Sequence, residues 1–196
     1  MPKDATEAGK ASDAQLLQLY AHGDAEAGAA MTARFLPLAY RLALRMLGQA
    51  ADAEDVAQEA MVRLFRQAPA WQEGRAQVGT WLYRVTANLC VDHVRRRRLA
   101  PLDAAAHIAA PLVPAEEALT DQARLAALQT ALDALPERQR LALVLRHLEG
   151  LTNPEVAAIM DVGVEAVESL TARAKRRLTE ILSMRQEELG YGGSNG

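Results

Sequence analysis

Apolar side chains return every three or four residues along most of this chain, and this period limits its fold more than any other feature. In the segment 52–67, for example, Val56, Ala60 and Leu64 fall on one side of a helix. A strand would instead alternate every second residue, which no segment does. We therefore predict an all-α fold. In the second half, the side chains expected to be buried are Leu125, Leu128, Leu132, Leu135, Leu141, Val144, Leu145 and Leu148.

Several helix ends are marked by residues that can hydrogen-bond the free backbone groups of a helix. Ser12 with Gln15, and Thr152 with Glu155, have the spacing of a capping box. Asp24 is placed to cap the next helix. From these signals and the apolar period we predict helices over 12–22, 25–47, 52–67, 80–98, 115–135, 136–149, 153–160 and 165–185, with a loop over 68–79.

Prolines divide the chain into two parts. Residues 99–114 contain three prolines among small residues, a composition that predicts a flexible linker. We therefore expect two helical domains, 12–98 and 115–185. The small and polar residues at the two ends, 1–11 and 186–196, are predicted to be disordered.

The charge of the chain is unevenly distributed. Residues 1–98 carry thirteen basic and eleven acidic side chains, whereas residues 99–196 carry nine and fourteen. One basic block spans 95–98 and another spans 173–177. Such blocks can neutralise nucleic-acid phosphates, or they can be solvated helix ends whose cations offset the helix dipole. On an acidic chain, they suggest weak DNA binding alone and useful binding beside a larger partner.

Several classes of protein are disfavoured by what the sequence lacks. Cys90 is the single cysteine, so no internal disulfide forms, and we expect it to be buried and inert. The four histidines are scattered without metal-ligand spacing, and no glycine-rich phosphate loop is present, so we expect neither metal nor cofactor. No apolar run suits a signal peptide or a membrane span, and we expect a cytoplasmic protein without membrane insertion.

Residues 153–182 have the pattern of a helix-turn-helix. A short helix over 153–160 is followed by a turn at 161–164 and by a second helix that carries basic residues. In DNA-binding proteins the first helix braces the second, which enters the major groove. A plain helical hairpin is the alternative. The residues expected to face outward from the second helix are Glu165, Glu168, Ser169, Ala172, Arg173 and Arg176.

Four runs of residues together resemble the extracytoplasmic-function group of sigma-70 family RNA polymerase sigma factors. The resemblance covers about residues 12–185, and the order and spacing of the runs make it specific. It rests on DAEDVAQE at 52–59, TWLYRVTANL at 80–89, DHVRRRR at 92–98 and LPERQR at 135–140, which precedes the helix-turn-helix.

The resemblance implies a protein that catalyses nothing itself and directs core RNA polymerase to promoters, of a stress-response regulon, under control of an anti-sigma factor. Region 2 binds the −10 element as single strand, and region 4 reads the −35 element as duplex. The implied polymerase contacts are Asp52, Glu54, Asp55, Gln58 and Glu59. The implied −10 contacts are Trp71, Arg75, Asn88, Asp92, Arg95, Arg96, Arg97 and Arg98. The implied −35 contacts are the six outward residues of the second helix.

Physical chemistry suits some of these roles better than others. An amide both donates and accepts, so Asn88 can read a base edge, and the arginine block can hold phosphates. Trp71 can stack on a base, although a lone aromatic there is more often a core anchor, and we expect Trp81 and Tyr83 to be core residues.

The second helix departs from the pattern of many family members at one place. Where they have GTVKSR, this chain has EAVESL at 165–170. Glu168 cannot hold a phosphate; it can accept from a cytosine amino group, or face protein or solvent. The −35 sequence therefore stays open.

Three other functions remain open at this point. An autonomous helix-turn-helix regulator with an N-terminal sensor domain would explain residues 136–182 but not 52–98. A small helical enzyme could use the carboxylates of 52–59 as its site. It would also need a catalytic base or further metal ligands, and the sequence shows neither beside them. The third possibility is a regulatory protein that mimics a sigma factor.

Overall fold

The structure, a computed structural model, describes residues 11–72, 77–99 and 116–188, and their side chains except those of 98–99, 116–124 and 185–188. All regular secondary structure in these ranges is helical, which confirms the predicted all-α fold. The predicted linker lies outside the described residues, apart from Leu99. So do most of the predicted disordered ends.

The first half of the chain forms a group of packed helices, here called the N-terminal bundle. Phe35, Leu42, Leu64 and Leu82 are buried at its centre, and each comes from an apolar stripe of its helix. The bundle consists of α1 (Asp13–Ala21), α2 (Ala25–Leu47), α3 (Ala50–Gln67), the short 3-10 helix η1 (Ala68–Ala70) and α4 (Val78–Leu99).

The predicted caps of this bundle are confirmed. The Ser12 hydroxyl accepts from the Gln15 N–H, and the Gln15 side chain accepts from the Ser12 N–H. The Asp24 carboxylate accepts from two backbone N–H groups at the start of α2. Gly48 ends α2 with a positive φ of 75°, a conformation that glycine adopts without strain.

The second half forms the C-terminal group of helices. Burial increases along its first helix toward its C-terminal end, where Leu128 is partly buried and Leu132 is buried. Leu135, in the turn that follows this helix, is buried too. The group consists of α5 (Glu116–Asp133), α6 (Glu137–Leu143), the π-helical turn η2 (Val144–Leu148), α7 (Asn153–Met160) and α8 (Val164–Glu188).

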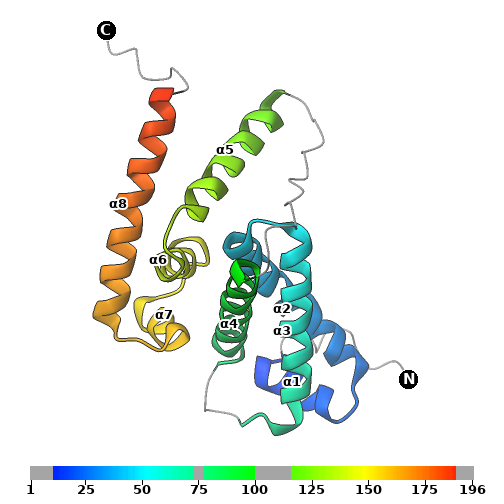
Figure 1. The fold of residues 1–196 in the computed structure, drawn as a ribbon. Helices are drawn as coiled ribbons and strands as arrows, with labels where there is room; N and C mark the ends of the chain where they lie inside the picture. Colours follow the sequence, from blue (N-terminus) through cyan, green and yellow to red (C-terminus); the bar gives the residue numbers. More distant parts are fainter. Residues whose placement is uncertain (1–10, 73–76, 100–115, 189–196) are drawn as a thin grey trace.

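Two of the leucines predicted to be buried are exposed. Leu125 is 53% exposed, because this part of α5 projects away from α6 and the N-terminal bundle (Figure 1). Leu148 is 41% exposed. It ends η2, where the wider π-helical spacing turns side chains away from the face that a regular helix would present.

Helix bounds differ from the predictions by a few residues at several places. α3 begins at Ala50 rather than 52, and α4 begins at Val78 rather than 80. α4 includes Leu99, which we predicted to lie in the linker. α8 extends through Glu188, so the prediction of disorder over 186–196 is wrong for its first three residues. Helix ends fray and are bounded by weak local signals, so differences of this size are expected.

The two halves are in contact. α4 packs against α7, and α2 packs against α5 and η2 (Figure 1). Buried apolar residues of both halves join in one cluster. None of the helices that the structure describes has the length and apolarity needed to cross a membrane.

Candidate nucleic-acid interface

The acidic residues predicted on α3 lie on the side of the helix that faces away from the core. Val56 and Ala60 lie on the opposite side of α3 and are buried in the bundle. Glu54, Asp55 and Gln58 are exposed. The remaining two predicted contacts, Asp52 and Glu59, are half-buried.

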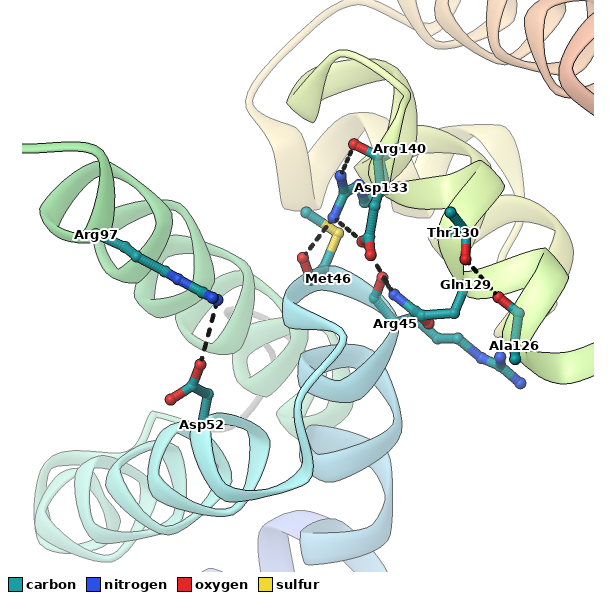
Figure 2. Close-up of polar contacts among 9 residues, drawn as sticks. All are labelled: Arg45, Met46, Asp52, Arg97, Ala126, Gln129, Thr130, Asp133 and Arg140. Atoms are coloured by element: carbon teal, nitrogen blue, oxygen red, sulfur yellow. Dashed lines mark hydrogen bonds and ion pairs between the residues drawn. The ribbon is translucent and has the colours of Figure 1, made fainter. Parts of the chain in front are cut away.

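Asp52 and Glu59 are held by basic residues of the same bundle. The Asp52 carboxylate lies 3.3 Å from His93 Nε2 on α4. It also lies 3.8 Å from Nη1 of Arg97 on the same helix (Figure 2). Glu59 pairs with Arg63 one turn along α3, at 2.8 Å. Asp52 therefore joins the acidic helix to the basic end of α4, while Glu54, Asp55 and Gln58 present the exposed polar face.

A groove runs between α3 and α4. Its volume is about 390 Å³, and its apolar floor is formed by Val56 and Leu89. Asp55 lines one side, and Arg96 lies on the other. A second hollow of about 450 Å³ includes Arg63, Asp92 and Arg95. The structure thus brings the predicted acidic and basic residues together along one pair of helices.

The outer face of α4 carries four of the eight predicted −10 residues. Asn88, Asp92, Arg95 and Arg96 are exposed and follow one another at helical spacing. The Arg96 side chain donates to the Asp92 carbonyl at 3.3 Å. Two further predicted contacts, Arg75 and the side chain of Arg98, lie outside the described residues.

The aromatic residues near the start of α4 pack inward. Trp71 and Trp81 meet edge to face, with ring centroids 6.1 Å apart, and both lie against the core. Tyr83 is buried, as predicted. Trp71 is only half-buried, so its ring combines a packing role with partial access to solvent.

The helix-turn-helix is formed by α7 and α8. Thr152 and Glu155 make the predicted capping box, and hydrogen bonds from the Thr152 hydroxyl and backbone N–H hold the pKa of Glu155 below its ordinary value. Asp161 turns the chain with a positive φ of 54°. Val156 and Val167 are fully buried, which braces the second helix against the first.

All six residues predicted to face outward from α8 are exposed: Glu165, Glu168, Ser169, Ala172, Arg173 and Arg176. Glu168 is directed toward the start of α7, where its carboxylate accepts from the Asn153 side-chain amide at 3.4 Å. Among the three possibilities left open for Glu168, the structure shows a contact with protein.

Four polar residues connect the two halves through contacts that the sequence did not predict. Arg41, Tyr83 and Arg84 of the N-terminal bundle and Glu149 of the C-terminal group contact one another or the opposite backbone across the interface. No local pattern marks these residues, because their partners are distant in sequence.

Both halves of the chain match known protein families. Residues 31–100 match the family profile Sigma-70 region 2, and residues 125–178 match the profile Sigma-70, region 4. The ECF RNA polymerase sigma factor SigM of Mycobacterium tuberculosis is 33% identical over 174 residues, which cover 87% of this chain and 85% of SigM. This chain belongs to the extracytoplasmic-function group of sigma-70 factors.

Other relatives of this sigma factor agree with that assignment. The ECF RNA polymerase sigma factor SigE of Mycolicibacterium smegmatis is 39% identical over 154 residues. The match covers 76% of this chain but only 59% of SigE. As an alternative sigma factor, the protein directs promoter-specific initiation of transcription.

Two solved structures share the fold. CnrH, in complex with the cytosolic domain of CnrY, has a TM-score of 0.67 and 24% identity, over 88% of this chain and 97% of CnrH. RpoE of Bartonella quintana, in complex with the anti-sigma factor NepR, has a TM-score of 0.64 and 23% identity, over 78% and 94%. The autonomous-regulator alternative left 52–98 unexplained, and the region 2 match now covers that segment.

Proposed function

We propose that this sigma factor binds core RNA polymerase through α3 and places it on promoters whose two elements contact α4 and α8. The observation that carries the proposal is the presence of two exposed faces with basic residues, one on each half of the chain, beside one exposed acidic helix face. A sigma factor needs three such surfaces, for one enzyme and two DNA elements. It supplies promoter specificity and contributes no catalytic step of its own.

The polymerase surface is proposed on α3. Glu54, Asp55 and Gln58 are exposed, and the neighbouring groove offers an apolar floor between α3 and α4. Exposed charges steer association and set its specificity, whereas desolvated apolar contacts supply affinity. We assign Asp52 and Glu59 to the same surface, where their ion pairs with the bundle also orient the helix.

The −10 surface is proposed on the outer face of α4. Asn88 is the proposed base reader, since its exposed amide can form two hydrogen bonds with one base edge. Arg95 and Arg96 are proposed to hold phosphates, which position a strand without reading it. The −10 surface also includes Trp71, Arg75, Asp92, Arg97 and Arg98.

The −35 surface is proposed on α8. Arg173 and Arg176 lie on the exposed face of α8. The chain turns directly into α8 from the end of α7, and this arrangement suits insertion of α8 into the major groove. Glu165, Ser169 and Ala172 share that face. Glu168 is proposed to act through its bond with Asn153, by fixing the start of α7 against α8.

We also make proposals about the domains, the cellular location and the control of the protein. We propose domains at 12–98 and 115–185, joined by the flexible linker 99–114, in a cytoplasmic protein that serves a stress-response regulon. The related CnrH and RpoE structures were determined in complex with the cytosolic domain of CnrY and with the anti-sigma factor NepR. We propose that an anti-sigma factor likewise holds this chain inactive.

Run-off transcription with purified core RNA polymerase tests the proposal. Genomic fragments are transcribed with core enzyme alone and with core enzyme plus this protein, whose folding is checked by circular dichroism. We expect specific transcripts only in the second reaction, each beginning downstream of a shared pair of elements. A folded protein that yields no specific transcript from any fragment would contradict the proposal.

A further inference from the structure

The helix-turn-helix is acidic where a surface that binds DNA phosphates would be basic. Residues 148–172 contain no lysine or arginine. The acidic residues of this stretch are Glu149, Glu155, Asp161, Glu165 and Glu168. Because carboxylates repel phosphates, general attraction to DNA does not explain these side chains. Each of them therefore needs either a structural explanation or a role in reading bases.

Four of the five have a structural explanation. Glu149 accepts hydrogen bonds from the N-terminal bundle, Glu155 completes the capping box of α7, and Asp161 lies 3.5 Å from an arginine of α4. Glu165 lies in the first turn of α8, where the helix dipole favours an anion. The effect of the dipole falls off within the first turn, so it does not explain Glu168.

The carboxylate of Glu168 is held in one direction and keeps one oxygen available. Its Oε1 atom accepts from the Asn153 side-chain amide at 3.4 Å, and Asn153 is the first residue of α7. Its Oε2 atom has no partner among the residues that the structure describes. In addition to fixing the start of α7 against α8, the bond thus orients an acceptor on the exposed face of α8.

The neighbours of Glu168 on α8 allow this acceptor to approach a base. Ser169 and Ala172 have short side chains and share the exposed face. Arg173 and Arg176 follow about 7.5 Å and about 12 Å further along the helix axis. The major groove is about 12 Å wide, so these arginines can reach the phosphates at its edge. In a helix-turn-helix, the N-terminal residues of the second helix contact the base edges, and Glu168 is the fifth residue of α8.

A carboxylate in the major groove discriminates strongly between bases, because it only accepts hydrogen bonds. Cytosine presents an amino donor there without an acceptor of its own, and adenine presents an amino donor beside the acceptor N7. Guanine and thymine present only acceptors, apart from the thymine methyl group. Opposite these two bases the carboxylate would lose its water without gaining a hydrogen bond. The order of preference is therefore cytosine, then adenine, then the other two.

We propose that Glu168 selects cytosine at one position of the −35 element, and that Asn153 is the positioning residue that orients its carboxylate. The inference rests on the proposed function, which places α8 on the −35 duplex. It goes further by naming the base that this side chain reads. It also explains why an acidic residue stands on a surface that approaches phosphates.

Selection from a library of DNA duplexes tests the base preference. Full-length protein bound to core RNA polymerase selects from duplexes with a randomised segment of a few helical turns, and the bound duplexes are sequenced. Wild type should select cytosine at one position. Glutamine pairs with adenine and arginine with guanine, so Glu168→Gln should change that position to adenine and Glu168→Arg should change it to guanine. The other selected positions should stay the same.

Fluorescence anisotropy on the selected duplex and its single-base-pair variants gives the size of the effect. Glu168→Gln should change the ratio of affinities for the cytosine and adenine duplexes by roughly 5- to 150-fold. Glu180→Gln makes the same chemical change at another exposed position of α8 and should leave the ratio unchanged. Circular dichroism establishes that each variant is folded.

Asn153→Ala separates positioning from a merely structural role. If Asn153 orients the Glu168 carboxylate, this variant should lose part of the preference for cytosine and keep its affinity for duplexes with the other bases. An equal decrease of affinity for all four duplexes would contradict the positioning role.

The selection also distinguishes a failure of this inference from a failure of the proposed function. If both Glu168 variants select the same element as wild type, Glu168 does not read a base, while the selected element still supports a −35 surface. If wild type selects no sequence at all, both the inference and the proposed −35 surface are wrong.

Discussion

Single side chains of α4 divide clearly between folding the chain and facing solvent. Leu82, Leu89 and Cys90 are buried, whereas Asn88 and Arg95 are exposed on the outer face. Substitutions at the buried positions would act on stability, while substitutions at the exposed ones leave packing intact. The functional roles proposed for α4 can therefore be tested without unfolding the protein.

Asn88→Ala should slow promoter opening and leave binding of core polymerase nearly unchanged. A lost bidentate base contact corresponds to about 1–3 kcal/mol, which is roughly a 5- to 150-fold decrease in open complex. Permanganate reactivity of unpaired thymines measures opening, and fluorescence anisotropy measures core affinity. Gln18→Ala, an exposed amide on α1, is the matched control. An equal loss of both activities would indicate structural damage instead.

Cys90 should make the protein less stable at alkaline pH. Burial raises the pKa of its thiol to about 12 from the ordinary 9.0, so the unfolded chain loses this proton at a lower pH than the folded one. The contribution is fully present below pH 9 and is lost as pH rises from about 9 to 12, with a slope of at most about 1.4 kcal/mol per pH unit. Urea unfolding of wild type and Cys90→Ala across this range measures it. The variant should show the shallower decline, and parallel curves would contradict the assignment.

At the scale of elements, the helix-turn-helix shows how local capping supports a binding surface. Thr152 and Glu155 satisfy the backbone at the start of α7, and Val156 and Val167 join α7 to α8. The exposed face of α8 is thereby held at a defined angle. α1 begins with the same type of capping box but lies in the other half of the chain, and so provides an internal comparison.

Thr152→Ala should destabilise the C-terminal group by about 1 kcal/mol and weaken binding of the −35 duplex. For a chain of this length, the expected decrease in melting temperature is about 2–4 °C. Ser12→Ala removes the corresponding cap of α1 and should cost similar stability without affecting −35 binding. Thermal unfolding and anisotropy of a −35 duplex with the holoenzyme separate the two effects. Equal losses of −35 binding in both variants would show that stability alone matters.

At the scale of the whole molecule, the two halves meet through a mixture of apolar packing and arginine contacts. Arg41 and Arg84 are about half exposed, at 52% and 47%, so salt can screen their interactions. The Glu149 side chain is only 4% exposed, so dissolved salt screens its charge less than it screens the two arginines. We therefore expect the contacts between the halves to weaken as ionic strength rises, while each half stays folded.

Raising the salt concentration from 0.05 to about 1 M should increase the radius of gyration of the free protein, since the Debye length falls to about 3 Å at 1 M. Small-angle X-ray scattering measures the radius, and circular dichroism should show unchanged helix content. The Glu149→Lys variant should be expanded already at low salt and respond less. A radius that is independent of salt in both proteins would show that charge does not hold the halves together.

Local signals in the sequence predicted much of the fold. The capping residues Ser12, Asp24 and Thr152 bind backbone groups two or three residues away, so each helix start follows from a few neighbouring residues. The exposed face of α8 also followed from helical spacing alone. Leu125 and Leu148 were wrongly predicted to be buried, because a helical period defines a face without showing how far the partner helix extends along it.

The sequence by itself therefore determined the helices, their caps and the family, since these depend on residues close together in the chain or on motifs in a set order. Only the tertiary structure decided which polar groups join the two halves. Arg41 and Glu149 are 108 residues apart, and Tyr83 and Glu149 are 66 apart. Contacts over such separations arise from the packing of whole helices, and no pattern of neighbouring residues encodes them.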